Sequence, residues 1–511
     1  MLRAMKAGTS PALPRVLAWA AGLALAFCIA HLAFLPLANG DMYWQVRAGE
    51  LLLEQRRFLD HDTFSYTIAG TPWNNHEWLF EVLLALIHRA FGWLGLRLLV
   101  LATIGGTFVA LGVYLARRCG VWLALCVLCA WLDLAWYKFI PAAQTTSMVL
   151  FLFGYWAFLR PSLGSTKRTI ALFAFLLVWG NLSAEVVVFL PFLVVDQIFR
   201  ALRKQGAEPP AIRRWLWLGL ALVVPALNPP GSSVAEYVLD GTRINRGVNS
   251  EFVHLWETAA SVHASIKTLA WLLIGAWSIW TLATIAAKHR PESRRVRLHR
   301  SAAPALAIAA ATLFERNLWL LIVPMVQMAL ALHRWLGQRA RTLMVNLGSA
   351  AAALGFFALF LHSLPWWGPR LALHDLSRAS FYTSHLSADD LPISCDEALQ
   401  TVGPERRILT SRLWGNWLIW RFPDRPVFID GRNREYPPVL HQWSEIAVNG
   451  NPGAQEILDA FRVEAVLARP GWLRQPGIRR AQWRRSFATK VCALYLRESS
   501  AAASSTESRA R

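Results

Sequence analysis

The sequence predicts an all-α membrane domain of about 11 transmembrane helices, followed by a small soluble α/β domain. Of the 511 residues, 55% are hydrophobic and only 16% are charged, and the mean hydropathy is +0.34, as in multi-spanning membrane proteins. After Pro365 the hydropathy falls, and strand-like segments alternate with helix-length ones. We therefore expect a membrane domain over 1–362, a soluble domain over 363–498 and a disordered Ser/Ala-rich tail over 499–511.

Eleven apolar stretches make up the predicted membrane domain. A span needs about 17–25 residues, and the stretches of that length are 16–37, 96–116, 119–140, 143–159, 266–287 and 343–362. Shorter or polar-interrupted stretches are 169–182, 184–199, 215–228, 301–315 and 317–333. The first stretch is too long for a signal-peptide core of about 7–15 residues, so we expect it to be an uncleaved span.

The basic residues predict how the chain is oriented. The formal net charge is +20, but the Lys and Arg residues occur as short clusters between apolar stretches, such as Arg117/Arg118, and form no basic face with interleaved aromatics. This distribution favours the positive-inside rule over nucleic-acid binding. Eleven crossings place the N-terminus in the cytoplasm and put the first loop, 39–95, outside it together with the soluble domain. Within this loop, 77–92 is expected to be an amphipathic helix lying at the membrane surface.

The soluble domain should contain strands near 407–411, 426–430, 463–468 and 491–496, with helices near 412–421, 437–448 and 452–462. Its two cysteines, Cys395 and Cys492, could form a disulfide if the domain lies outside the cytoplasm. The pair Cys126 and Cys129 has no partner at zinc spacing, and helix packing explains it better.

The first loop holds the best candidates for chemistry. Asp41 lies just beyond the first span, where its carboxylate could act as a general base. The equal alternative is an N-cap for the helix that its neighbours predict. Asp60 and Asp62 have the spacing of a ligand pair for Mg²⁺ or Mn²⁺, although Asp62 also suits a turn before an extended segment.

Two further residues of this loop are candidates. Glu77 could supply a second catalytic carboxylate, and it shares a helix face with Glu81. His76 could contribute charge or a hydrogen bond to a phosphate group. An ordinary interfacial helix, with Trp73 and Trp78 in an aromatic belt, is the favoured alternative.

Polar residues elsewhere complete the set. Arg316 could clamp a lipid-linked phosphate or pair with a neighbouring Glu, and Glu185 and Asp133 are expected within apolar segments. Arg432 follows a predicted strand with Arg434 and Glu435 nearby, and could bind an acceptor, brace the domain or belong to a simple turn. Most of the 26 tryptophans should be interface anchors or packing residues. Those in loops, where sugar stacking would matter, are Trp44, Trp73, Trp78, Trp414 and Trp417.

Several motifs together resemble a known group of proteins. They are D41-x-x-W44, D60-H61-D62-T63-F64-S65-Y66-T67, P72-W73-x-x-H76-E77-W78-L79, N228-P229-P230-G231, R316-N317, W414-G415-N416 and V427-F428-I429-D430-G431-R432. The chain is similar in these motifs to a large group of bacterial integral membrane proteins related to glycosyltransferases of the GT-C superfamily. The resemblance covers most of the chain but names no substrate.

The resemblance implies an enzyme of the bacterial cytoplasmic membrane that moves a sugar from a polyprenyl-phosphate donor to a glycan, lipid or protein acceptor on the outer side. It maps the acidic residue of the family's first outer loop, a base or metal ligand, onto Asp41. The sequence departs from the pattern at Ile140, where an Arg is expected before Pro141, and at Ser183, where a His is common. Because of these departures, an alternative stays open: the protein has lost the catalytic activity and serves as a scaffold or as a lipid-carbohydrate binding protein. A transporter is less favoured, because the chain shows no inverted repeat.

Overall fold

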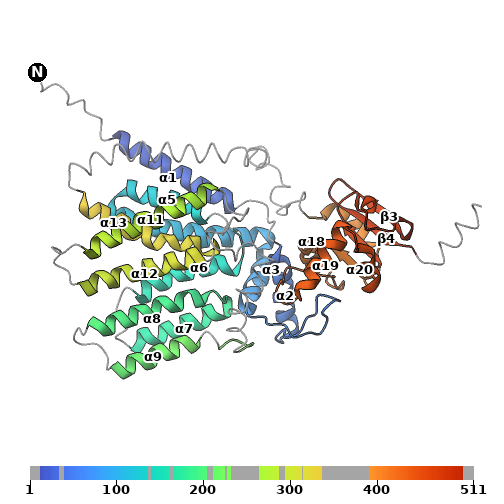
Figure 1. Cartoon of the computed structure of the whole chain (residues 1–511), viewed down its shortest axis with the longest axis horizontal. Helices are drawn as coiled ribbons and strands as arrows, with labels where there is room; N and C mark the ends of the chain where they lie inside the picture. Colours follow the sequence, from blue (N-terminus) through green and yellow to red (C-terminus); the bar gives the residue numbers. More distant parts are fainter. Residues whose placement is uncertain are drawn as a thin grey trace, which may run out of the picture.

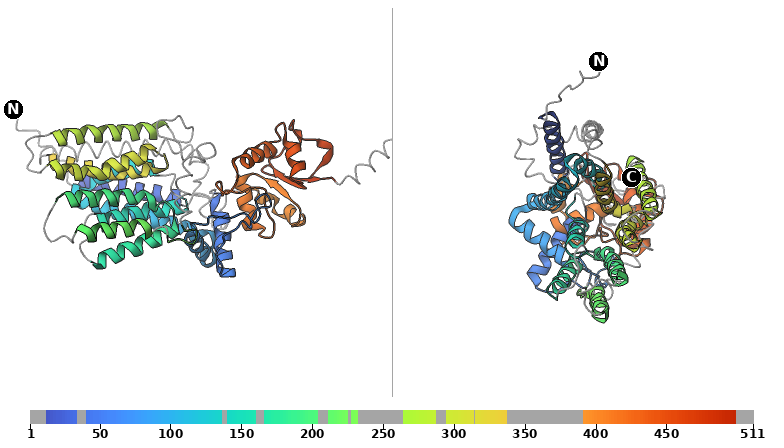
Figure 2. Two further views of the ribbon diagram at one scale, coloured as in Figure 1. Left: turned by 60° about the horizontal axis from the view of Figure 1, so that its bottom comes forward. Right: turned by 90° about the vertical axis from the view of Figure 1, so that its left-hand side faces the viewer.

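The structure is a computed structural model, and it describes residues 12–33, 40–135, 140–159, 166–203, 211–224, 227–231, 264–286, 294–313, 315–336 and 391–498. A bundle of long helices and a smaller α/β domain lie end to end, with α2 (Asp41–Gln55) and α3 (Trp78–Val100) between them (Figure 1). The left view of Figure 2 shows the same arrangement from another side, and the right view looks at the bundle from the end that faces away from the α/β domain. This junction is where the first loop meets the soluble domain.

The bundle confirms most of the predicted helical stretches. The predicted span 143–159, for example, is α6 (Ala143–Gly154) continued by the π-helical stretch η3 (Tyr155–Leu159). The predicted span 343–362 lies outside the described residues. The other bundle elements are α1 (Ala12–Ala33), the π-helical η1 (Leu101–Gly105), α4 (Gly106–Cys119), α5 (Val121–Ala135), α7 (Thr166–Leu182), α8 (Val186–Arg203), α9 (Ala211–Val223), α11 (Ala264–Ala286), α12 (Arg294–Leu313), η7 (Glu315–Leu321) and α13 (Ile322–Trp335).

Large apolar side chains lie on the outside of this bundle as well as inside it. Trp19 is 74% exposed, Ile279 71% and Leu282 68%. Exposed apolar surface on several helices of one bundle is what a lipid-facing protein presents. By length and composition, two described helical segments qualify on their own as membrane spans, namely Trp78–Cys119 and Asn317–Trp335. The count of eleven spans therefore stays a prediction.

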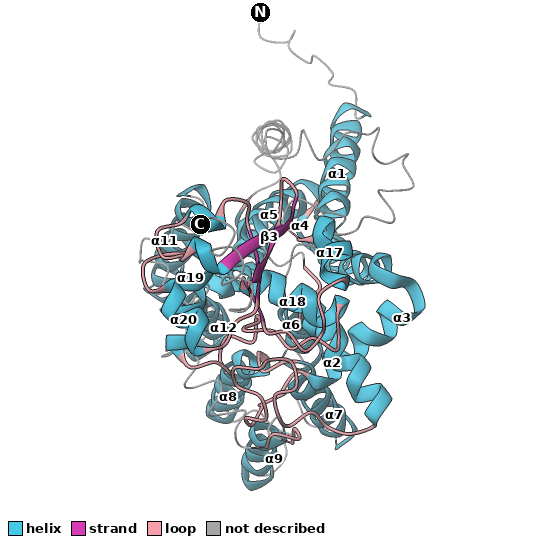
Figure 3. Ribbon diagram, turned by 90° about the vertical axis from the view of Figure 1, so that its right-hand side faces the viewer, coloured by secondary structure: helices cyan, strands magenta, loops and turns pink. Residues whose placement is uncertain are grey.

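The helix α3 bends at one glycine. Gly92 has φ 59° and ψ −157°, a backbone conformation that glycine adopts and other residues avoid. The bend divides the segment after Trp78 from the part of α3 that enters the bundle (Figure 3). It lies at the end of the segment 77–92 that the sequence predicts to rest on the membrane surface.

The α/β domain is built on a four-stranded sheet with strand order β1-β2-β4-β3. The strands are β1 (Ile408–Thr410), β2 (Ala465–Ala468), β3 (Trp483–Ala488) and β4 (Ala493–Arg497). β1 and β2 are parallel, and the other neighbours are antiparallel. The helices are α17 (Asp396–Gln400), α18 (Arg412–Arg421), α19 (Pro438–Asn449) and α20 (Ala454–Ala460), with short 3-10 turns at Ile393–Cys395, Trp472–Arg474 and Arg480–Gln482.

Two strand predictions for this domain were wrong. The segment 426–430 makes only isolated bridges at Val427, because its neighbour on one side is the short extended piece around Ser65 rather than a full strand. The strand β3 was not predicted, since its residues 484–488 are exposed and include Arg484 and Arg485. Charged side chains are typical of an edge strand, where they discourage pairing with other chains.

A disulfide joins Cys395 and Cys492, 97 residues apart in the sequence. Both cysteines are fully buried, and they tie the start of the described domain to the strand β4. The alternative that the sequence left open is therefore settled in favour of the disulfide. Cys126 and Cys129 are free thiols in α5, as packing residues would be.

Candidate active site at the junction

The first loop is hydrogen-bonded to the edge of the soluble domain's sheet through isolated β-bridges. Ser65 and Val427 form a parallel β-bridge, in which Val427 N–H donates to Phe64 O (2.9 Å) and Tyr66 N–H donates to Val427 O (3.1 Å). The Thr67 hydroxyl donates to Phe428 O at 2.6 Å, and Val427 also bridges β1 at Ile408. The loop is thereby held at the edge of the sheet, so residues before and after it have fixed positions.

Arg432 is the centre of a buried ionic network across this junction. Its guanidinium pairs with Asp62 of the first loop, and with Asp430 through Nη2 at 2.6 Å. The side chains of all three residues are at most 2% exposed. The guanidinium lies over the rings of Phe64 (5.0 Å) and Trp73 (4.7 Å). An arginine suits this environment because its guanidinium is planar and carries a fork of N–H donors, so it can bind carboxylates and lie over aromatic rings at the same time. A lysine ammonium group cannot do both.

This network corrects the expectation that Arg432 binds a ligand. Burial alone would lower the pKa of Arg432, but Asp430, Tyr436 and Asp62 outweigh it and hold the pKa well above its ordinary value. The two carboxylates bind the guanidinium through Nε and Nη2, while Nη1 is buried and has no hydrogen-bond partner among the described residues. Arg432 therefore braces the domain against the first loop, one of the alternatives that the sequence left open.

The same network separates the two carboxylates predicted to hold a metal. Asp62 is turned inward, where it also accepts from the Ser65 hydroxyl at 2.8 Å and from Ser65 N–H at 3.1 Å. Asp60 is 54% exposed and hydrogen bonds His61 Nδ1 at 2.8 Å. Among the described residues, no group of three or more His, Cys, Asp or Glu side chains is arranged to hold a metal ion. Asp60 and Asp62 therefore do not fit a shared Mg²⁺ or Mn²⁺ ion in this geometry.

Asp41 lies against the loop that carries Gly431. A Cβ on Gly431 would collide with Asp41 Oδ1 and would lie 2.6 Å from Asn416 Nδ2. Asn416 Oδ1 accepts from Gly431 N–H at 2.6 Å, and Trp44 Nε1 donates to Asp41 Oδ1 at 3.4 Å. Asp41 is the first residue of α2, whose N-cap position is Gly40. The carboxylate is thus placed by contacts from both parts of the chain, and the N-cap alternative does not describe it.

Glu77 and His76 come just before α3, and Glu77 is linked through Gln45 to α2, the helix that carries Asp41. Gln45, one turn after Asp41 on α2, donates to Glu77 Oε2 at 3.1 Å, and Glu77 Oε1 is 3.8 Å from His76 Nε2. Burial lowers the pKa of His76 to about 4, outweighing the raising effect of a hydrogen bond to the Asn74 backbone, and Arg434 adds a smaller lowering effect. His76 is therefore neutral at pH 7, so it can exchange hydrogen bonds with a ligand but brings no positive charge to a phosphate.

Two carboxyl groups, Glu81 and the half-buried Glu435, lie next to this segment. Glu81, on α3, is fully buried and accepts from Asn75 Nδ2 at 2.8 Å through one oxygen, while its Oε1 has no hydrogen-bond partner. Burial raises the pKa of Glu435 to about 7, against the lowering effects of Arg432, the Asn74 backbone N–H and Arg434. A carboxyl group that titrates near neutrality can give or take a proton at working pH.

Asparagines from the bundle fix the segment that carries His76. Asn228, in the Asn-Pro-Pro-Gly turn, donates to His76 O and to Gly180 O, each at 2.9 Å. Trp78 Nε1 donates to Asn181 Oδ1 at 2.8 Å. Motifs separated by about 50 to 150 positions therefore meet at one end of the bundle.

The other predicted site residues lie apart from this group or cannot be placed. The side chains of Arg316, in η7, and Asp133, in α5, are outside the described part of the structure. Glu185 lies in the turn between α7 and α8 rather than within an apolar span, and its N–H donates to the Ser183 hydroxyl at 3.2 Å.

The loop tryptophans pack inside the junction. Trp44, Trp73, Trp414 and Trp417 are between 2% and 8% exposed. Tyr43, which sequence reasoning did not single out, contacts Trp417 edge-on with ring centroids 5.3 Å apart. Aromatic packing therefore accounts for these tryptophans without a sugar.

Sequence reasoning also missed three amides of the site. Gln45 and Asn75 bind Glu77 and Glu81, and Asn416 binds the backbone of Gly431. The signal for Gln45 was its position one helical turn after Asp41. Asn75 is adjacent to His76 but carried no periodic or motif signal of its own.

No family model matches the chain, and no curated protein matches its sequence. Solved structures with a similar arrangement include the archaeal oligosaccharyltransferase AglB from Archaeoglobus fulgidus in complex with an inhibitory peptide and a dolichol-phosphate. It is 12% identical with a TM-score of 0.48, over 88% of this chain and 69% of that one. ArnT from Cupriavidus metallidurans bound to undecaprenyl phosphate is 15% identical with a TM-score of 0.46, over 96% and 99%. Both TM-scores are below 0.5, so the reaction has to be inferred from the residues of this chain.

Proposed function

We propose that this protein is a membrane glycosyltransferase that moves a sugar from a polyprenyl-phosphate donor to an acceptor at the junction. The observation that carries the proposal is the position of Asp41, which α2 presents against Gly431 and Asn416 of the soluble domain. A base held between a lipid-facing bundle and a soluble domain can serve a substrate that is itself part lipid and part sugar. The first-loop motifs that resemble the GT-C group support the same reaction.

The proposed step is a displacement at the anomeric carbon of the donor sugar. An acceptor hydroxyl attacks this carbon, and Asp41 takes the hydroxyl proton. The bond between the anomeric carbon and the phosphate oxygen breaks, and the polyprenyl phosphate leaves with the bonding electrons. Glu77 is proposed as the second carboxylate, and neutral His76 as a hydrogen-bonding group for donor or acceptor.

The leaving phosphate needs a positive partner, for which we propose Arg316. Arg432 does not serve, since two carboxylates occupy it. Because Asp60 and Asp62 do not fit a shared ion, no step is routed through a metal. By the distribution of basic clusters, we place the N-terminus in the bacterial cytoplasm and the site on the outer face of the cytoplasmic membrane.

A transfer assay with membranes that contain the protein tests this proposal. Wild type, Asp41→Asn and Glu77→Gln would be given radiolabelled polyprenyl-phosphate sugars from a panel of donors, with and without a divalent-metal chelator. Glu54→Gln is a matched control, because Glu54 lies on the same helix as Asp41 and is 55% exposed. We expect transfer by wild type and by the control, and a loss of about 10²-fold or more in Asp41→Asn, as for the removal of a general base.

The alternative is a catalytically lapsed member that binds lipid-linked sugar. The observation that favours it is Ser183, fully buried and engaged with the Glu185 backbone at the position where the related group often has a His. Donor binding without transfer by wild type, across the whole panel, would support this alternative and contradict the enzyme. Full transfer by Asp41→Asn would contradict the role of Asp41.

A further inference from the structure

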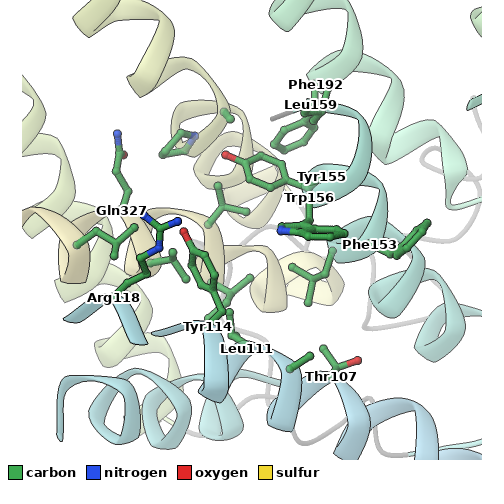
Figure 4. Close-up of a pocket in the computed structure, with 18 of the residues that line it drawn as sticks. Thr107, Leu111, Tyr114, Arg118, Phe153, Tyr155, Trp156, Leu159, Phe192 and Gln327 are labelled. Carbon is green, nitrogen blue, oxygen red and sulfur yellow. The ribbon is translucent and has the colours of Figure 1, made fainter. Parts of the chain in front are cut away.

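A large cavity lies between the helices of the bundle, and neither Asp41 nor Glu77 lines it. It has a volume of about 1310 Å³ and is lined by α4, α6, α8, α11, α12 and α13, with the stretches η1 and η3. Figure 4 shows Tyr114 and Arg118 of α4 facing Tyr155 and Trp156 of η3 across it. Most of its lining is aliphatic or aromatic, so an apolar ligand part would gain by entering.

The cavity belongs to the end of the bundle that faces away from the soluble domain. The helix α8 begins beside Ser183, near the junction, and Asp196 and Arg200 of the cavity lie toward its other end. Arg117 and Arg118 are at the last turn of α4, and Arg334 is in the last turn of α13. The ends of three helices thus bring basic side chains to one mouth.

The cavity is at least as deep as one leaflet of a bilayer. Its lining runs from Ile322 to Arg334 on α13, roughly 18 Å of helix, and from Ala102 to Arg118 on η1 and α4, roughly 24 Å, at about 1.5 Å per residue. Half of a hydrocarbon core of about 30 Å is about 15 Å. A chain that enters at the arginines would therefore fill the cavity to about the middle of the bilayer.

The mouth carries positive charge that the described residues do not neutralise. Arg117, Arg118 and Arg334 are exposed, and within the described ranges none of them forms an ion pair. Arg200 differs from them, because Asp196 pairs with it at 2.6 Å and Leu159 O accepts from it at 2.7 Å. Three guanidinium groups at a lipid-facing opening favour a phosphate group.

The helices that border the cavity are irregular where they line it. Both π-helical stretches of the described chain, η1 and η3, contribute lining residues, among them Thr103 and Tyr155. A π-helical turn is less stable than an α-helical one and occurs frequently at functional sites.

We propose that this cavity binds an anionic phospholipid, with one acyl chain inside it and the phosphate at Arg117, Arg118 and Arg334. A depth of at least one leaflet suits an acyl chain. The basic mouth faces the leaflet that the positive-inside rule assigns to the cytoplasm, where anionic phospholipids give a negative surface. The site is separate from Asp41 and does not depend on the proposed transfer reaction.

Native mass spectrometry of the delipidated full chain tests the proposal. The protein would be titrated with phosphatidylglycerol, phosphatidylcholine or polyprenyl phosphate. Each arginine near an anionic lipid contributes roughly a factor of five in affinity, so we expect phosphatidylglycerol to bind at least about tenfold more tightly than phosphatidylcholine. The combined change Arg117→Gln, Arg118→Gln and Arg334→Gln should abolish this preference, and the three Arg→Lys changes should retain most of it.

A second pair of variants tests the cavity itself. A Cβ on Gly106, which lines the cavity, meets nothing within 4 Å, so Gly106→Leu should fill the space without displacing the backbone. Gly219 of α9 has the same freedom and does not line the cavity, so Gly219→Leu is the matched control. We expect Gly106→Leu to weaken phosphatidylglycerol binding and Gly219→Leu to leave it unchanged, with both proteins monodisperse and helical.

Three results would overturn the proposal. They are equal binding of the two phospholipids by wild type, an unchanged preference in the triple Gln variant, and binding of polyprenyl phosphate in place of phosphatidylglycerol at the same arginines. Normal binding by a well-folded Gly106→Leu protein would equally exclude the cavity as the place of the acyl chain.

Discussion

Replacing Arg432 by Met should release the first loop from the soluble domain. The change leaves the carboxylates of Asp62 and Asp430 buried without their cation, whereas in the wild type their side chains are at most 1% exposed. Removal of one partner from a buried pair costs about 3–5 kcal/mol. Asp62→Asn should cost less, about 1–3 kcal/mol, because Arg432 keeps Asp430.

Hydrogen exchange measured by mass spectrometry can detect this release. Peptides covering 62–71 contain the Tyr66 amide, which donates to Val427 O and exchanges when the loop detaches. A loss of about 3 kcal/mol, at about 1.36 kcal/mol per factor of ten, should speed exchange there by about 10²-fold. Peptides of α18 to α20 should stay protected, which shows that the domain remains folded.

An exposed ion pair provides the control. Arg479 and Glu456 approach to 3.4 Å but are 58% and 66% exposed, so Arg479→Met should change stability by no more than about 1 kcal/mol. If Arg432→Met left exchange over 62–71 within about threefold of wild type, less than about 1 kcal/mol, the network would not be what holds the loop.

Three further predictions concern the junction and the domain beside it. Gly431→Ala should reduce transfer as strongly as Asp41→Asn in the same assay, because its Cβ would displace the Asp41 carboxylate. Burial raises the pKa of Glu435 from 4.5 to about 7, so its protonated form stabilises the folded chain fully below about 4.5, and this stabilisation is lost as pH rises through about 7. Glu435→Gln should therefore flatten that part of a plot of Tm against pH. Cys395→Ser should make the soluble domain about 2–5 kcal/mol less stable in denaturant, since the disulfide to Cys492 closes a loop of 97 residues.

Each of these has a matched comparison. Gly22→Ala should leave transfer unchanged, because a Cβ there meets nothing within 4 Å, and equal activity of Gly431→Ala and Gly22→Ala would contradict the steric argument. Glu445 is exposed on α19, and Glu445→Gln should keep the wild-type pH slope. The effect of Cys395→Ser should disappear when both proteins are compared under reducing conditions, and a persistent difference would point to packing rather than to the bond.

Local features of the sequence determined most helices and part of the sheet. The segment 412–421 was predicted as a helix and is α18, and the strands near 407–411, 463–468 and 491–496 are β1, β2 and β4. These predictions succeed because hydrophobic length and strand-type composition are properties of consecutive residues. Asp41 was singled out from its position after the first apolar stretch; the structure places it against Gly431, and its catalytic role stays a prediction.

Only the tertiary structure decided what the charged side chains do. Asp62 and Arg432 are 370 positions apart, and nothing near either one indicates that they meet in a buried network. An aspartate that binds a metal and one that pairs with arginine have the same local sequence; what differs is which distant backbone lies beside them. The same holds for the Ser65–Val427 bridge, because long-range pairing depends on how the two parts of the chain are placed together. For the disulfide, the sequence offered the pair Cys395 and Cys492 as a possibility, and the structure decided that they are bonded.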